Sequence, residues 1–232
     1  MSPLYVVSTP IGNLEDITQR ALRILKEADL VACEDTRRTG RLLRHYGIEK
    51  KLVSFHSHNQ ARAIRPLLEL LSTGKSMALV SDGGTPGISD PGALLVNLAR
   101  EQEIPVVPVP GPSALSALLS VAGAPVAGMT FGGFLSPKAG RRRKRLKELL
   151  NRDGGVVLFE SPHRILKLLE DLRLLAPERR LLLGREMTKL HEEFLMGNAE
   201  QLLTELTGRA KMIGEFTVYV HPEKKVQVDP GL

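Results

Sequence analysis

The most constraining stretch of this sequence is residues 77–92, MALVSDGGTPGISDPG, in which a short apolar run meets a glycine-rich loop. The apolar run predicts a buried strand, and the two adjacent glycines allow a sharp turn that leaves no side chains over its end. Ser89 or Asp90 is predicted to cap a helix that begins at Pro91. Because open α/β sheets bind ligands at the carboxyl ends of their strands, the loop is a candidate binding site. A strand–helix turn that binds nothing explains it almost as well.

The first half of the chain alternates short apolar runs with stretches of helical spacing, which predicts a mostly parallel sheet. The expected strands are 4–7, 30–33, 51–54 and 77–80, and the expected helices are 18–28, 36–46, 60–71 and 90–101. The proline-rich stretch 104–112 contains one more short strand and suggests a domain boundary. We therefore expect an α/β protein of two domains, 1–110 and 111–232, the second an α+β domain with a mixed sheet.

Composition limits the class of protein. The chain has 232 residues, of which 42% are hydrophobic and 25% charged, as in ordinary globular proteins. With a single cysteine, Cys33, it can form neither an internal disulfide nor a cysteine-based zinc site. It has no run long enough for a membrane span and no signal-peptide pattern at its start. The expectation is a cytoplasmic protein without a membrane partner.

Positive charge is concentrated in one place. The formal net charge is +6, and the stretch 138–147, KAGRRRKRLK, is a dense basic block that continues into an expected helix. A solvated helix face and a phosphate-binding surface explain this block about equally well. Only 4% of the residues are aromatic and none is Trp, which argues against a platform for base stacking.

Several common chemistries lack their motifs. No G-x-G-x-x-G follows a strand, and neither a P-loop nor a nucleophile elbow is present. His56 and His58 have no spaced third ligand, so no metal site is expected. What remains is a set of polar loops that follow successive strands, at 8–13, 34–38, 56–59 and 81–90. Their joint position at one sheet edge is the evidence for a site, since single residues such as Asp35 and Asn59 are also explained as helix caps.

Five ordered motifs carry a resemblance to a known family. They are STPIGNLED at 8–16, EDTR at 34–37, HN at 58–59, SDGGTPGISDPG at 81–92 and VPGPSA at 109–114. Together they resemble the tetrapyrrole-methylase superfamily and, within it, the ribosomal RNA small subunit methyltransferase I group, over nearly the whole chain. The resemblance implies two α/β domains with S-adenosylmethionine in the cleft between them, a homodimer, and 2′-O-methylation of a cytidine of 16S rRNA in the 30S subunit.

The resemblance also assigns a cofactor site. Its expected residues are Pro10, Asp82, Gly83, Gly84, Thr85, Ile88, Ser113, Ala114, Phe159, Glu160 and Gly214. The absence of phosphate-binding motifs agrees with this assignment, because S-adenosylmethionine carries no phosphate. A bent cofactor needs close backbone approach, which a Gly–Gly turn supplies.

A ribose hydroxyl is a weak acid, so a base or a nearby charge should assist methyl transfer. The residues expected in this role are Asp35, Glu186 and Lys189, while Arg37, His56, His58 and Glu160 also have suitable side chains. Lys189 could lower the pKa of the hydroxyl or bind phosphate. A surface salt bridge to Glu186 or Glu192 is the simpler explanation.

The residues expected to contact RNA are Arg37, Arg38, His58, Asn59, Arg141, Arg142, Arg143, Lys144 and Arg145. The basic block follows a Gly-Gly strand and Ser136-Pro137, which suggests a flexible arm that becomes ordered on RNA. Members of the group often carry a further C-terminal segment, whereas this chain ends at Leu232, so we expect it to depend more on its basic helix. No DNA partner is expected.

Two alternatives remain open. The first is methylation of a corrin or porphyrin precursor with the same cofactor, but a small tetrapyrrole does not need so extended a basic surface. The second is a non-enzymatic RNA-binding protein that keeps the fold, against which the intact cofactor loop argues.

Overall fold

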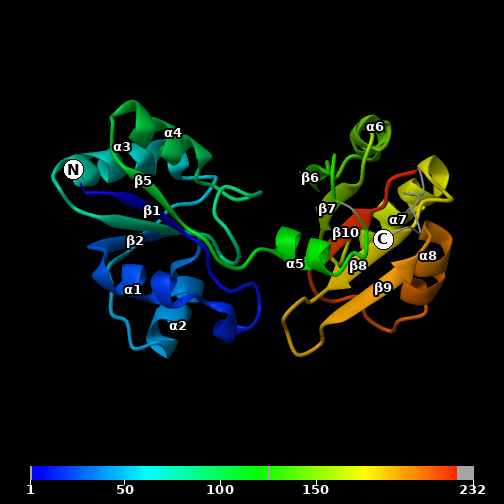
Figure 1. Cartoon of the computed structure of the whole chain (residues 1–232), viewed down its shortest axis with the longest axis horizontal. Coiled ribbons are helices and arrows are strands. Elements are labelled where there is room, and N and C mark those ends of the chain that lie inside the picture. Colours follow the sequence, from blue (N-terminus) through cyan, green and yellow to red (C-terminus); the bar gives the residue numbers. More distant parts are fainter. Residues whose placement is uncertain (1, 125, 224–232) are drawn as a thin grey trace, which may run out of the picture. The chain divides into compact units, whose positions relative to one another are not determined.

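A computed structural model of the chain describes residues 2–124 and 126–223 and divides into two compact units, Met1–Ser113 and Ala114–Leu232 (Figure 1). Each unit carries one five-stranded sheet with helices packed on it, so the expected α/β fold class is confirmed. None of the helices described within these ranges is long and apolar enough to cross a membrane.

The sheet of the first unit has the order β3-β2-β4-β1-β5, and all of its strands are parallel. Its strands are β1 (Leu4–Val7), β2 (Leu30–Cys33), β3 (Leu52–Ser54), β4 (Met77–Val80) and β5 (Val106–Val109). A 3-10 turn, η1 (Leu14–Asp16), precedes the helices α1 (Gln19–Glu27), α2 (Thr36–His45), α3 (Gln60–Ser72) and α4 (Ala93–Glu101). The parallel sheet inferred from the alternation is confirmed.

Helices cover both faces of this sheet, α1 and α2 on one side and α3 and α4 on the other (Figure 1). Alternate strand residues therefore enter two separate cores. Leu79 of β4 packs with the α3–α4 side, whereas Ala78 and Val80 pack with the α1–α2 side. Because the central strands are buried on both faces, they are apolar throughout rather than alternating.

Local signals place three helix ends of the first unit. The Thr18 hydroxyl accepts a hydrogen bond from the backbone of Ala21 and caps α1, and Asp35 caps α2 in the same way. Gly47, with φ of 64°, follows the end of α2 as the sequence predicts.

The start of α4 differs from the prediction. The helix begins at Ala93, and the residue before it is Gly92, with φ of 142° and no side-chain cap. Ser89 adopts φ of 66°, and neither it nor Asp90 caps the helix, so this part of the prediction is wrong. The reason is packing, because a Cβ on residue 92 would lie 3.0 Å from the Leu79 side chain and only glycine lets the turn close against β4.

The second unit is built on a sheet of order β6-β7-β10-β8-β9. β6 and β7 are parallel, and the other neighbouring strands are antiparallel, which confirms the expected mixed sheet. Its elements are α5 (Ala114–Ser120), β6 (Thr130–Phe134), α6 (Ala139–Leu150), β7 (Val156–Glu160), α7 (Ile165–Leu175), β8 (Leu181–Arg185), β9 (Glu193–Gly197), α8 (Ala199–Thr207) and β10 (Phe216–Val220).

The basic block forms α6, a regular helix. Leu146 and Leu149 of this helix are fully buried and pack with Val156 and Leu158 of β7, together with residues of α7 and α8. The expectation of a flexible arm is therefore wrong, because the leucines that follow the basic residues fix the helix on the sheet. The opposite face of the sheet holds α5, whose Leu118 lies against Gly184 of β8.

Candidate functional site

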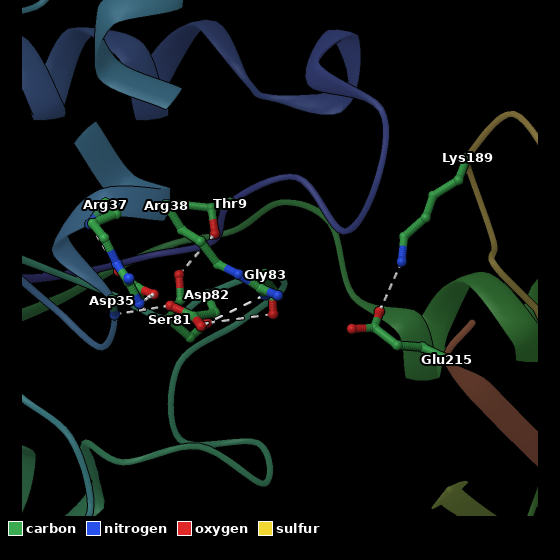
Figure 2. A network of polar contacts seen from close by, with 9 residues as sticks. All are labelled: Thr9, Asp35, Arg37, Arg38, Ser81, Asp82, Gly83, Lys189 and Glu215. Atoms are coloured by element: carbon green, nitrogen blue, oxygen red, sulfur yellow. Dashed lines mark hydrogen bonds and ion pairs between the residues drawn. The ribbon is translucent and has the colours of Figure 1, made fainter. Parts of the chain in front are cut away.

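The loops that follow β1 and β4 are joined at the carboxyl edge of the first sheet. The backbones of Thr9 and Gly84 exchange two hydrogen bonds, 2.9 Å and 2.8 Å long, and so form an isolated antiparallel bridge. The Thr9 hydroxyl also donates to the carbonyl of Ser81 at 3.3 Å (Figure 2). Two of the four loops expected at this edge therefore form one fixed structure.

A third loop, which follows β5, joins the same structure. The hydroxyls of Ser8 and Thr85 lie 2.8 Å apart, and Thr85 donates to the carbonyl of Pro112 at 3.2 Å. Ser113 comes next and ends the first unit, while Ala114 begins α5. The Thr85 hydroxyl therefore links the β4 loop to the residue just before Ser113.

The glycine pair of the β4 loop is required by close packing. A Cβ on Gly83 would lie 3.1 Å from the carbonyl oxygen of Pro10. Gly84 has φ of 87°, which residues with side chains rarely adopt, and a Cβ there would lie 3.4 Å from the Ile11 side chain. Backbone therefore lies against backbone where Pro10, Gly83 and Gly84 were expected to hold the cofactor.

Asp35 has a structural role in this rim. Its carboxylate accepts the backbone N–H of Arg37 at 2.8 Å and pairs with the Arg37 guanidinium at 3.1 Å (Figure 2). These hydrogen bonds lower the pKa of Asp35 to about 2. A carboxylate of that acidity is a weak proton acceptor, which argues against the expected catalytic role and favours the helix cap.

Asp82 connects the β2 and β4 loops. Its carboxylate accepts the backbone N–H of Asp35 at 2.9 Å and lies 3.6 Å from the guanidinium of Arg38. Arg37 and Arg38 are both exposed, so a polyanion has access to their guanidinium groups even though each has a carboxylate partner.

Asp90 is the group at this edge that the sequence did not suggest for chemistry. Burial and the nearby charge of Glu34 raise the pKa of Asp90 to about 6, against the effect of a hydrogen bond with Ser81. Burial also raises the pKa of Glu34, and Asp82 adds to that effect. The sequence treated Asp90 as a helix cap, and no pattern in it shows that this carboxyl group is partly buried beside Glu34.

Asn59 holds the loop after β3 in place. Its carbonyl oxygen accepts the backbone N–H of His56 at 2.8 Å, and its amide donates to the carbonyl of Ser54 at 3.0 Å. It precedes α3 but makes no capping bond to that helix. His58 and Asn59 are the residues of this loop that were expected to contact RNA. His58 is exposed, so its side chain is more accessible than that of Asn59.

In the second unit, Lys189 is at the centre of an ionic cluster. Its ammonium donates to Glu186 at 2.8 Å and to Glu215 at 3.1 Å, the second contact being drawn in Figure 2. Burial alone would lower the pKa of Lys189, but the two carboxylates outweigh it and raise the pKa above its ordinary value. Lys189 is therefore a fixed cation and not a base.

The backbone around Glu186 is folded to hold this cluster. Glu186 has φ of 48°, and its backbone N–H donates to the carbonyl of Glu215 at 3.0 Å. Gly214 has φ of 102°, and any Cβ on it would clash with the Glu186 side chain. Burial would raise the pKa of Glu186, but hydrogen bonds from Lys189 and from the Glu215 backbone lower it, so Glu186 too is a weak base. Glu215 is the ionic partner of Lys189 that the sequence did not reveal.

Phe159 and Glu160 end strand β7. The Glu160 carboxylate is 1% exposed, accepts the backbone N–H of Ser161 at 2.8 Å and pairs with Arg164 at 3.2 Å. The Glu160 carboxylate is therefore held between Ser161 and Arg164, and its charge is not exposed to solvent. The Phe159 ring is in edge-to-face contact with Phe131 and Phe134 of the neighbouring strand β6.

The arginines of α6 do not act as one surface. Arg142 is 4% exposed, and both it and Arg143 lie 2.6 Å from the carboxylate of Asp171 on α7. The expected RNA contact by Arg142 is therefore wrong, because its charge is neutralised inside the unit. Arg143 is exposed but shares Asp171, and Arg145 pairs with Glu148 at 3.1 Å.

Comparison with known proteins gives concordant matches. The family model for tetrapyrrole (corrin/porphyrin) methylases matches residues 3–203. A protein of Neisseria meningitidis serogroup B, named ribosomal RNA small subunit methyltransferase I, is 47% identical over 94% of this chain and 76% of its own. A Thermotoga maritima protein of the same name is 46% identical over 94% of this chain and 97% of its own.

Solved structures agree on the fold. Uroporphyrin-III-C-methyltransferase from Thermus thermophilus superposes with a TM-score of 0.66 at 24% identity, over 95% of this chain and 94% of that one. Diphthine synthase superposes with a TM-score of 0.75 at 17% identity, over 96% and 91%. A further structure of the Thermus enzyme, complexed with S-adenyl homocysteine, has a TM-score of 0.65 at 19% identity, over 95% and 97%.

Proposed function

Because the chain belongs to the tetrapyrrole (corrin/porphyrin) methylase family, we propose that it is an S-adenosylmethionine-dependent methyltransferase that acts on small-subunit ribosomal RNA. The observation that carries this proposal is the 46–47% identity, over 94% of the chain, to two proteins named ribosomal RNA small subunit methyltransferase I. We further propose the 2′-hydroxyl of a 16S rRNA cytidine as the acceptor, on the resemblance of the motifs.

The loops of the first unit fit S-adenosylmethionine, which supplies an activated methyl group when bound. The bridge between Thr9 and Gly84 fixes the β4 loop, and a side chain on Gly83 would meet the Pro10 carbonyl. Close backbone packing of this kind holds the rim of a small-molecule site in a fixed conformation, and it needs no phosphate-binding motif. We therefore keep Pro10, Asp82, Gly83, Gly84, Thr85, Ile88 and Ser113 as cofactor residues of this unit, and Ala114, Phe159, Glu160 and Gly214 as those of the second.

The acceptor chemistry needs a group that takes a proton and charges that hold the RNA. Asp90, with a pKa of about 6, can hold and release a proton near neutral pH, and we propose it in place of Asp35 as the proton acceptor. Lys189 is a permanent cation that would stabilise a developing alkoxide or hold a phosphate, and Glu186 orients it.

The net charge of +6 suits an RNA partner. Arg37, Arg38 and His58 on the first unit, and exposed cations of α6 on the second, are proposed to contact the RNA backbone. A substrate in the 30S subunit places the protein in the cytoplasm, and we expect a homodimer from the family resemblance.

The test is methyl transfer from labelled S-adenosylmethionine to 30S subunits, to naked 16S rRNA and to a tetrapyrrole precursor. Digestion of the RNA to nucleosides then locates the label. Label on a cytidine ribose supports the proposal. Gly84→Val should abolish cofactor binding, because Gly84 has φ of 87° and a larger side chain would meet Ile11. Gly208→Ala is the matched control, since its Cβ position lies at an ordinary contact distance of 3.8 Å from the carbonyls of Thr204 and Glu205 and its φ is −70°.

The runner-up is methylation of a corrin or porphyrin precursor, which the likeness to uroporphyrin-III-C-methyltransferase favours. Label on the tetrapyrrole alone would support it. Absence of both label and cofactor binding would instead support an RNA-binding protein without catalytic activity.

A further inference from the structure

Three aromatic rings of the second unit form a cluster on strands β6 and β7. The Phe159 ring on β7 lies 5.1 Å from Phe131 and 5.6 Å from Phe134, both on β6, in edge-to-face contacts. These are three of the six phenylalanines in the chain. The low aromatic content argued against a stacking platform, but half of the phenylalanines gather at a single place.

Phe134 is the exposed member of this cluster. It is the last residue of β6, and 57% of its surface is accessible, which is unusual for a ring of this size. Its edge-to-face contact with Phe159 favours one orientation of the ring. An aromatic ring that is oriented by a neighbour and open to solvent is a surface on which an unpaired base can stack.

A stripe of cations begins four residues later. Lys138, Arg141 and Lys144 follow at helical spacing at the start of α6 and are exposed. Within the described part of the chain, none of the three has an ion-pair partner, in contrast to Arg142, Arg143 and Arg145 of the same helix. Their charge is therefore available to a polyanion.

The ring and the stripe lie close together. Only residues 135–137 separate Phe134 from Lys138, so their Cα atoms are at most about 15 Å apart. Phe134 ends β6 and Lys138 precedes α6, so both lie at the connection between these two elements of the second unit, which are labelled in Figure 1. An aromatic ring with adjacent unpaired cations is complementary to single-stranded RNA, in which the base faces are free and each nucleotide carries a phosphate.

We propose that Phe134 and the stripe of Lys138, Arg141 and Lys144 form a binding surface for an unpaired segment of the substrate RNA. One base stacks on Phe134, and the neighbouring phosphates contact the stripe. This inference rests on the proposed function, because it assumes an RNA substrate, and it goes further by naming the surface and the single-stranded form that it recognises.

Stacking is tested by the affinity for a fluorescent, unstructured RNA of about 12 nucleotides, within the range of known single-strand sites. Phe134→Ala should raise Kd about fivefold to a hundredfold, as expected for the loss of one base–aromatic stack. Phe134→Tyr should keep the affinity near that of the wild type. Leu174→Ala is the matched control, because Leu174 is 63% exposed on α7 and lies outside the surface.

The salt dependence of binding separates the two parts of the surface. Arg141→Gln and Lys144→Gln should each reduce the slope of log Kd against log salt by about 0.7, the value for one phosphate contact on a single strand. Phe134→Ala should leave this slope unchanged. Lys167→Gln, which removes an exposed cation of α7, should change neither slope nor affinity.

Three outcomes would overturn the inference. Phe134→Ala could leave the RNA affinity unchanged, it could weaken calorimetric binding of S-adenosylhomocysteine and so place the ring in the cofactor site, or it could convert a dimer to a monomer in light scattering. Methyl transfer to 30S subunits by the wild-type protein is measured beside these assays. If it occurs while Phe134→Ala binds RNA normally, the surface is refuted and the proposed function stands; if it does not occur, the function itself fails.

Discussion

At the residue scale, two aspartates of the same sheet edge have opposite acidities. Hydrogen bonds from Arg37 lower the pKa of Asp35 to about 2, whereas burial and the charge of Glu34 raise the pKa of Asp90 to about 6. The ionised form is favoured in the folded protein at Asp35 and disfavoured at Asp90. The two carboxyl groups therefore affect stability in opposite directions as the pH changes.

The first prediction concerns Asp90→Asn. The folded-state pKa of Asp90 is above its ordinary value of 3.8, so its favourable contribution is fully present below about pH 4 and is lost as the pH rises through about 6. The amide cannot ionise, so this variant should be more stable than the wild type at pH 8, by about 1 kcal/mol after allowance for solvent screening, and equally stable near pH 4. Urea midpoints at the two pH values measure this difference.

Asp35→Asn is the matched control for stability. It should destabilise the protein at pH 8, because Asp35 is favoured as a carboxylate. A stability gain for Asp90→Asn that is the same at both pH values would contradict the assigned burial. For catalysis, kcat/KM of the wild type should rise with pH through about 6, and Asp90→Asn should remove that limb; a limb that persists would exclude Asp90 as proton acceptor.

The second prediction concerns Lys189. Lys189→Gln removes the cation but keeps a side chain that can donate to Glu186 and Glu215. If Lys189 stabilises the developing alkoxide, kcat for methyl transfer should fall on the order of 100-fold with unchanged cofactor affinity, and Lys189→Arg should restore part of it. A rise in KM for RNA alone would show a phosphate contact instead. Unchanged kinetics would show that Lys189 only forms a surface salt bridge and takes no part in the reaction.

The sequence predicted where these residues lie better than it predicted their pKa values and their ionic partners. The motif order placed Asp35, Asp82 and Gly83 at one edge of a parallel sheet, because each lies in a loop that follows a strand. It did not show the acidity of Asp90 or the contact of Lys189 with Glu215, since both depend on residues that approach only after folding. The sign of a pKa shift comes from such tertiary neighbours.

At the element scale, Asp171 fixes the position of α6. Its carboxylate, 1% exposed, lies 2.6 Å from both Arg142 and Arg143, so one residue of α7 holds two arginines of α6. From the sequence alone the basic block is a run of similar charges. Which of its arginines is buried and which are exposed depends on the carboxylate of Asp171, which lies 29 residues beyond Arg142 in the sequence.

The third prediction is that Asp171→Ala destabilises the second unit by about 3–5 kcal/mol, because it leaves the buried guanidinium of Arg142 without its carboxylate partner. The decrease in the free energy of unfolding is measured by urea denaturation. Glu148→Ala removes the exposed partner of Arg145 on the same helix and should change stability by about 0.5 kcal/mol or less. If the two variants lose similar stability, the ion pairs of Asp171 with Arg142 and Arg143 are not important for the fold.

Helix boundaries were predictable where they depend on local bonds. Thr18 caps α1 through Ala21, three residues away, and the sequence identifies that signal. The start of α4 depends instead on a contact of Gly92 with Leu79 in another element. The nearby Ser89 and Asp90 therefore suggested a helix cap that the structure does not contain. Asn59 shows the same limit, since its side chain bonds to His56 and Ser54 rather than to the helix that it precedes.

At the scale of the whole molecule, each unit contains its own hydrophobic cores. Those of the first unit lie on both faces of one parallel sheet, and all of its ladder pairs join strands within residues 4–109. A unit of 113 residues is of ordinary domain size. It therefore has the core and the completed sheet that an independent domain needs.

The last prediction is that residues 1–113 fold when expressed alone. The fragment should unfold in one cooperative urea transition and give a well-dispersed amide spectrum, because both cores are complete within it. The control is residues 1–101, which lack β5. In the intact sheet β5 pairs with β1 from Leu4↔Val106 to Val7↔Val109, and Ile104 and Val109 are buried. Without β5, an edge of β1 and apolar surface on both faces are exposed, so this shorter fragment should be unfolded or aggregate. A fragment 1–113 with the narrow amide dispersion of an unfolded chain would show that the first unit needs the second to fold.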